Sequence, residues 1–166
     1  MTDWNAEPFR FASLGRKAVV ADLRGGRLTT DAGALLLRDL EQRLGLFRAL
    51  DEAIPDPRLP ELITHEQRAL LARRITALAL GYEALNDQLT PRDDPALQLA
   101  AGVDPDAAAP LASPATLCRL ENRVDRAALV RIATVLVDQF IAAHPEPPGH
   151  LMLDLDATDD PVHGHQ

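Results

Sequence analysis

Cysteine is almost absent from this 166-residue chain, because Cys118 is its only one. A single cysteine excludes an intrachain disulfide and a zinc site built from several thiolates. The sequence also has no apolar run near the roughly 18 residues of a membrane helix, and its first residues lack the layout of a secretory signal. These absences predict a cytoplasmic protein with no membrane partner.

Positive charge is scarce and comes almost wholly from arginine. The formal net charge is -8, and Lys17 is the only lysine among 17 basic residues. An acidic chain is a poor generic nucleic-acid binder, because neutralising phosphates requires clustered cations. Any DNA contact is therefore expected to be local. Arginine suits phosphate and guanine recognition, although a GC-rich genome produces the same bias.

The first 28 residues are predicted to form an extended segment or hairpin. Phe9 and Phe11 alternate with polar neighbours, a second apolar group follows at residues 19–23, and Gly25-Gly26 is a turn signal. Residues 29–144 are instead typical of helices. One helix is expected to start at the capping residues Thr29, Thr30 and Asp31, and to end at Gly45.

Further helix signals follow along the chain. Thr64 and Gln67 fit a capping box, which predicts a long helix over residues 64–84. Asp94-Pro95 and Ser113-Pro114 each place a capping side chain before a proline at the first helical position. Asp125 is expected to cap the last helix. That helix carries an apolar stripe at helical spacing, which predicts a core-facing surface: Leu129, Ile132, Ala133, Leu136, Val137, Phe140 and Ile141.

Two groups of polar residues on these helices are candidate DNA contacts. The first half of the 64–84 helix carries Arg68, Arg73 and Arg74, and the helix opened by Ser113-Pro114 carries Thr116, Arg119 and Arg123. Short polar and arginine side chains near a helix start can reach base edges. The alternative for both groups is a solvated helix surface.

The last segment, residues 145–166, combines a proline-rich linker with a short apolar stretch. Leu151, Leu153 and Leu155 alternate with Met152, Asp154 and Asp156, so a strand would place both aspartates on one face. Aspartate is depleted in strands and costly to bury alone. The pair indicates either a site for a hard divalent cation or a solvated strand end.

The run 154–166, which contains Asp156 and Thr158 as an Asp-x-Thr element, resembles the first catalytic segment of DDE transposases from bacterial insertion sequences. Three upstream blocks, at 79–87, 92–97 and 113–122, resemble the helical region that precedes this segment in one transposase subgroup. The resemblance implies a mainly α fold that ends in the first β-strand of a truncated ribonuclease H-like domain. It implies Asp156 as the catalytic aspartate and metal ligand, with Asp154 as either the alternative ligand or an acid that supports the ligand.

The resemblance also implies a function. The complete enzyme would use Mg²⁺ or Mn²⁺ to cleave and join DNA, and the helical region would bind the terminal inverted repeats of the element and support homo-oligomers, associated with the nucleoid. The family uses a further aspartate and a glutamate from downstream, which a chain ending at Gln166 does not supply. We therefore expect this chain alone to be inactive and to hold no metal stably, as either a transposase fragment or a truncated gene product. The alternative function is an inert helical DNA-binding or protein-interaction module.

Overall fold

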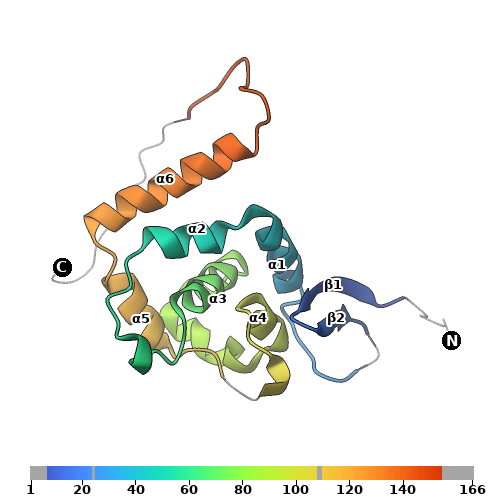
Figure 1. Cartoon of the computed structure of the whole chain (residues 1–166). Helices are drawn as coiled ribbons and strands as arrows, with labels where there is room; N and C mark the ends of the chain where they lie inside the picture. The colour runs from blue at the N-terminus through green and yellow to red at the C-terminus, as the bar shows by residue number, and fades with distance from the viewer. Residues whose placement is uncertain (1–6, 24, 108–109, 155–166) are drawn as a thin grey trace.

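The computed structural model describes residues 7–23, 25–107 and 110–154, without the side chain of Thr90, and it is mainly helical (Figure 1). Strands β1 (Phe9–Leu14) and β2 (Lys17–Ala21) pair antiparallel, which confirms the expected hairpin. Its turn lies at Gly15, whose φ of 57° suits glycine, and not at Gly25-Gly26.

Six α-helices follow within the described residues. They are α1 (Gly33–Leu44), α2 (Leu46–Ala53), α3 (Gln67–Ala79), α4 (Pro95–Ala100), α5 (Pro114–Asn122) and α6 (Arg126–Ala142). Three 3₁₀ helices lie between them: η1 (Pro60–Leu62), η2 (Leu85–Asp93) and η3 (Pro105–Ala107). Within the described ranges, none of these helices combines the length and apolar character that a membrane span requires.

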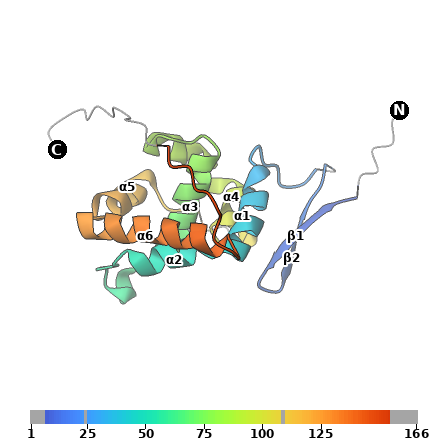
Figure 2. The same ribbon diagram turned by 90° about the horizontal axis from the view of Figure 1, so that it is seen from above.

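Helix α3 is central, because it contacts α2, α4 and α5 (Figures 1 and 2). Its Leu70 and Leu71 pack with Leu50 of α2 and with Leu117 and Leu120 of α5 in one buried cluster. A second cluster joins the hairpin to α1 and α4, and a third joins α3 to α4. The hairpin therefore packs on α1 at one side of the helical body.

Several predicted helix ends are confirmed because they depend on local chemistry. The Ser113 hydroxyl accepts from the Thr116 amide at 3.3 Å, and Asp125 accepts from the Ala128 amide at 2.7 Å. Asp94 accepts from the amides of Ala96 and Leu97 at the start of α4. Gly45 ends α1 in the left-handed conformation.

Two other capping predictions are wrong. Helix α1 has Ala32 at its N-cap position and no side-chain cap, because Asp31 instead accepts a 2.9 Å hydrogen bond from the Tyr82 hydroxyl. Helix α3 starts at Gln67 without a capping box, because the Gln67 amide donates to the carbonyls of Asp51 and Ile54 near the end of α2. Tertiary contacts thus replace the local caps.

Helix α3 is also shorter than the predicted 64–84 helix. It ends at Ala79, where Gly81 adopts a φ of 93° and the Tyr82 amide donates to the Ala77 carbonyl at 2.9 Å. A left-handed residue just past the helix satisfies the last carbonyls, which stops the helix there.

The prediction that the apolar stripe of α6 lies in the core is wrong. Helix α6 packs against α2 as an outer layer (Figure 1), and only Ala128 of α6 is fully buried. The part-buried residues Ile132 and Val135 join the core, whereas Leu136 and Val137 are more than half exposed. Periodicity identified an apolar helix, but no second layer covers its outer side within the described residues.

The predicted strand near residues 151–156 is not formed in its described part. Residues 151–154 have no regular secondary structure, and Leu151, Met152, Leu153 and Asp154 are exposed. A strand needs a pairing partner, and no strand of the described fold pairs with this segment. Residues 155 and 156 lie outside the described residues.

Candidate nucleic-acid interface

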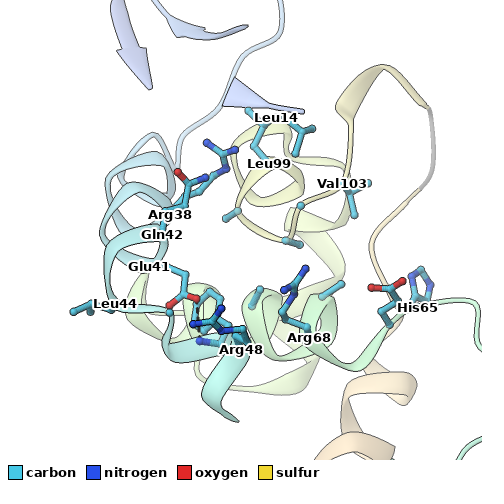
Figure 3. A pocket seen from close by; sticks show the side chains of 18 of the residues that line it. Leu14, Arg38, Glu41, Gln42, Leu44, Arg48, His65, Arg68, Leu99 and Val103 are labelled. Atoms are coloured by element: carbon cyan, nitrogen blue, oxygen red, sulfur yellow. Dashed lines mark hydrogen bonds between the residues drawn. The ribbon is translucent and has the colours of Figure 1, made fainter. Parts of the chain in front are cut away.

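A cleft of about 770 Å³ opens between the hairpin turn, α1, α2, the start of α3 and the end of α4 (Figure 3). The arginines that line it are Arg38, Arg43, Arg48 and Arg68. Only two carboxylates, Glu41 and Glu66, line the same cleft. This surface is therefore cationic in a chain whose net charge is -8, and we call it the arginine cleft.

The bend at Gly45 builds one wall of the arginine cleft. Gly45 has a φ of 64° and is shared by the end of α1 and the start of α2. Its amide donates to the Glu41 carbonyl at 2.7 Å, which closes α1. Because the chain turns here, Arg43 of α1 and Arg48 of α2 line the same space.

Arg38 fixes the hairpin at the edge of the cleft. It is buried, and its guanidinium donates to the carbonyls of Ala12 and Ser13, at 2.9 Å in the case of Ser13. Burial lowers its pKa, and the nearby Asp39 opposes that change. Arg38 is thus a structural cation that secures β1 to α1.

The other three arginines of the cleft are available to a ligand. Arg43, Arg48 and Arg68 are exposed, and none makes a hydrogen bond or ion pair with the described part of the chain. Figure 3 shows Arg48 and Arg68 on one wall, with Glu41 beside them. Three exposed guanidinium groups that make no hydrogen bond or ion pair with the described residues are suited to an anion with several oxygens.

Glu41 is the main negative group near Arg48 and Arg68. Burial raises its pKa, whereas backbone hydrogen bonds from Phe47 and Leu46 and the charges of Arg68 and Arg48 oppose the rise. Its Oε1 accepts from the Phe47 amide at 2.9 Å, and its Oε2 is buried without a hydrogen bond in the described structure. Glu41 therefore faces the start of α2 and leaves the outer guanidinium groups exposed.

The three arginines predicted on α3 occupy different environments. Arg68 lines the arginine cleft. Arg73 is 1% exposed and donates to the Gln88 carbonyl at 2.6 Å, and burial, together with the charge of Arg92, lowers its pKa to about 10. Arg74 pairs with Glu121 at 2.5 Å. A buried guanidinium has no access to a phosphate in this fold, so Arg73 is not a candidate DNA contact.

The candidates at α5 are separate from the cleft. Arg119 is exposed and has no hydrogen bond or ion pair within the described residues. Thr116 lies 3.1 Å from the Ser113 hydroxyl at the helix start. Arg123, which follows the helix, donates to Asp56 at 3.0 Å and to the side chain of Gln67. Of the three, Arg119 alone is an exposed cation whose side chain has no partner in the described part of the chain.

No metal centre is assembled in the described part of the chain. Asp154 is exposed, and Asp156 lies outside the described residues. Residues 7–23, 25–107 and 110–154 contain no group of three or more histidine, cysteine, aspartate or glutamate side chains placed to hold an ion. A divalent cation needs several oxygen ligands, so these residues do not by themselves fit one.

The match to a known family covers almost the whole chain. Residues 11–166 match the family described as Transposase DDE domain group 1. The chain belongs to this transposase family. DDE transposases act on DNA and generally use divalent metals. No curated protein and no solved structure matches the chain significantly.

Because this family acts on DNA, a cationic cleft is a candidate DNA contact, and three of its residues could not be predicted from sequence motifs. Arg43, Arg48 and Glu41 belong to no motif. The available signal was Gly45, a helix-ending glycine with arginines two residues before it and three residues after it. Recognising the cleft also required the packing of α3 against α2, which places Arg68 opposite that bend.

Proposed function

We propose that this chain is the DNA-binding and assembly part of a DDE transposase, and that its arginine cleft binds the phosphate backbone at the terminal inverted repeats of the element. The observation that carries the proposal is the convergence of Arg43, Arg48 and Arg68 in one cleft of an acidic chain, all three exposed and with no side-chain hydrogen bond or ion pair to the residues that the structure describes. Transposase membership supplies DNA as the general partner.

The chemistry of the cleft suits phosphate better than base edges. A guanidinium group can donate two parallel hydrogen bonds to a phosphate, and arginine is weakly hydrated compared with an ammonium group. The cations come from α1, α2 and α3, so their relative positions are fixed by the packed core. Such contacts would set the position of the DNA, and sequence would be read elsewhere. Arg119 of α5 is our candidate for that second contact.

In our proposal Asp156, with Asp154, contributes carboxylate ligands for Mg²⁺ or Mn²⁺ in the complete enzyme. Such ions would supply the charge stabilisation that phosphodiester cleavage and strand transfer require. Two carboxylates are too few to hold a pair of ions, so further acidic ligands must join them. The alternative, an inert helical module, retains the same cleft and differs only in lacking this chemistry.

A binding titration tests the proposal. The chain is titrated against a fluorescent duplex of the terminal inverted repeat, and the double variant Arg48→Ala/Arg68→Ala is compared with the control Arg10→Ala/Arg16→Ala. Both control arginines lie in the hairpin segment and are exposed, and their side chains make no hydrogen bond or ion pair among the described residues. We expect about a tenfold or greater loss of affinity for the cleft variant and little change for the control. Equal losses of DNA affinity in the cleft variant and the control would show that binding depends only on the net charge of the chain.

A further inference from the structure

Glu41 is a carboxylate in a cleft that otherwise suits anions, and one of its two oxygens has a structural task. The side chain crosses the bend at Gly45, and its Oε1 accepts a hydrogen bond of 2.9 Å from the Phe47 amide in the first turn of α2. Helix α2 has no acid in its first turn and no side-chain cap, because Gly45 is its N-cap residue. Glu41 therefore supplies the negative charge that the amide end of α2 favours.

The second oxygen of Glu41 has no such task. Oε2 is buried and accepts no hydrogen bond from the described residues. Burial of a carboxylate oxygen without a hydrogen bond is costly, so nearby cations have to compensate the charge. Burial accordingly raises the pKa of Glu41, and the charges of Arg68 and Arg48 oppose the rise. Figure 3 shows Glu41 beside these two arginines in the cleft.

A phosphate in the cleft would use the same two guanidinium groups. Arg48 lies close to the bend, because its Nη2 is 3.5 Å from the position that a Cβ on Gly45 would take. A phosphate bound there would add negative charge near Glu41 and would engage the cations that compensate the carboxylate. Both effects favour the neutral acid over the carboxylate.

We propose that Glu41 takes up a proton when a phosphate group of the DNA backbone occupies the arginine cleft, so that DNA binding by this chain is linked to pH. The inference rests on the proposed function, because it requires phosphate in the cleft. Linkage is reciprocal, so protonation of Glu41 tightens phosphate binding by the factor by which phosphate favours protonation. The neutral acid keeps a carbonyl oxygen for the Phe47 amide, so the start of α2 stays in place.

The other groups in the cleft could also titrate and have to be separated from Glu41. The other charged or ionisable side chains of its lining are Arg38, Arg43, Arg48, Arg68, His65 and Glu66. They come from α1, α2, the start of α3 and the loop before it, whereas the hairpin turn and the end of α4 add none. The arginines stay charged near neutral pH. Burial and three neighbouring arginines lower the pKa of His65. His65 and Glu66 are therefore the positions for controls.

Isothermal titration calorimetry of the 166-residue chain with a duplex of the terminal inverted repeat measures proton uptake directly. Titrations in two buffers of different ionisation enthalpy, at one salt concentration and about pH 6, give the number of protons bound per complex. We expect net uptake by the wild type and an affinity that rises about tenfold from about pH 8 to about pH 5. This measurement needs no variant, and a wild type that takes up no proton would overturn the inference.

The variant Glu41→Gln identifies the group that binds the proton. Its amide keeps an oxygen for the Phe47 amide but does not titrate, so we expect the pH dependence to fall to about threefold or less. Glu66→Gln is the matched control, because it removes a carboxylate from an exposed position of the same cleft. It should change the affinity by a similar factor at every pH. His65→Gln should also keep the proton uptake. Wild-type uptake in Glu41→Gln, or its loss in His65→Gln, would contradict the assignment to Glu41.

The failure of this inference can be told from the failure of the proposed function. If Arg48→Ala/Arg68→Ala binds DNA as tightly as the wild type, the cleft does not contact phosphate and both proposals are wrong. If that variant loses affinity while Glu41→Gln still takes up a proton like the wild type, the proposed function stands and only the role of Glu41 is wrong. Thermal melts of each variant confirm that the compared proteins are folded.

Discussion

Arg123, at the end of α5, donates a hydrogen bond of 3.0 Å to Oδ1 of Asp56, which lies 67 residues earlier in the chain. The same guanidinium donates to the side chain of Gln67, whose amide donates to the Ile54 carbonyl at 2.7 Å. Arg123 thereby joins the loop after α2, the start of α3 and the end of α5. In this fold it is primarily a structural residue.

Asp56 should make the fold sensitive to acid. The hydrogen bond from the Arg58 side chain is the main cause that lowers the pKa of Asp56 from 3.8 to about 2, and the charge of Arg123 contributes. Because the folded state prefers the carboxylate, the stabilisation is complete above the unfolded pKa and is lost as the pH falls from about 4 to about 2. We expect Asp56→Asn to lower the free energy of unfolding by about 1 kcal/mol at pH 7, allowing for solvent screening.

Urea denaturation at a series of pH values measures this effect. The difference between wild type and Asp56→Asn should shrink toward pH 2, because the wild type then loses the same charge. Asp93→Asn is the matched control, since Asp93 is exposed and its side chain makes no hydrogen bond or ion pair within the described residues. If both variants follow the same pH curve, the pairing of Asp56 contributes no stability.

Arg119 and Arg123 should have different roles. We expect Arg119 to act at the surface and Arg123 to stabilise the fold. Replacing Arg123 with alanine removes the hydrogen bonds that Asp56 and the side-chain oxygen of Gln67 accept from it, so we expect a loss of about 2 kcal/mol in the free energy of unfolding. Arg119→Ala should leave stability unchanged, because the side chain is exposed and makes no hydrogen bond or ion pair with the described residues. Thermal melts measure stability, and titration with repeat and scrambled duplexes shows whether Arg119 reads sequence. Equal destabilisation by the two variants would contradict this separation.

Arg73 should contribute to the packing of the core and not to DNA binding. We expect Arg73→Met to stay within about 1 kcal/mol of wild type, because it removes a buried charge while retaining most of the volume. Arg73→Ala should lose about 3 kcal/mol by leaving a cavity. Denaturation measures both values, and DNA affinity of the methionine variant should equal that of wild type. If Arg73→Met folds with native stability but binds DNA more weakly than wild type, Arg73 contacts DNA after all.

The chain alone should bind Mg²⁺ only weakly, with a dissociation constant above about 1 mM, because the described residues gather no set of three ligands. Isothermal titration calorimetry with MgCl₂ measures the affinity, with Asp156→Asn as the comparison. Tight, stoichiometric binding that Asp156→Asn abolishes would show that a metal centre forms in this chain after all.

The parts of the fold that depend on short-range chemistry could be predicted from the sequence. Ser113, Asp125 and Gly45 mark helix ends because one side chain or one backbone conformation decides each case. Whether an apolar helix face is covered depends on what lies beside it, so helical spacing alone could not show that Leu136 is exposed.

The arginine cleft could not be predicted for a related reason. Arg68 and Arg73 lie on the same helix, five residues apart, yet one lines the cleft and the other is buried beside Gln88. Helical spacing shows that the two point in different directions, but only the packed neighbours decide which direction is solvent. Arg48 lines the cleft because the chain bends at Gly45, and no sequence motif marks this position.

The salt dependence of DNA binding tests most directly the central claim that the arginine cleft contacts phosphate. Each phosphate contact contributes about 0.9 to the slope of log K against log salt concentration. We predict that Arg48→Ala/Arg68→Ala lowers the magnitude of this slope by between about 1 and 2, whereas Arg10→Ala/Arg16→Ala leaves it unchanged. A folded cleft variant that keeps the wild-type slope and affinity would contradict the account.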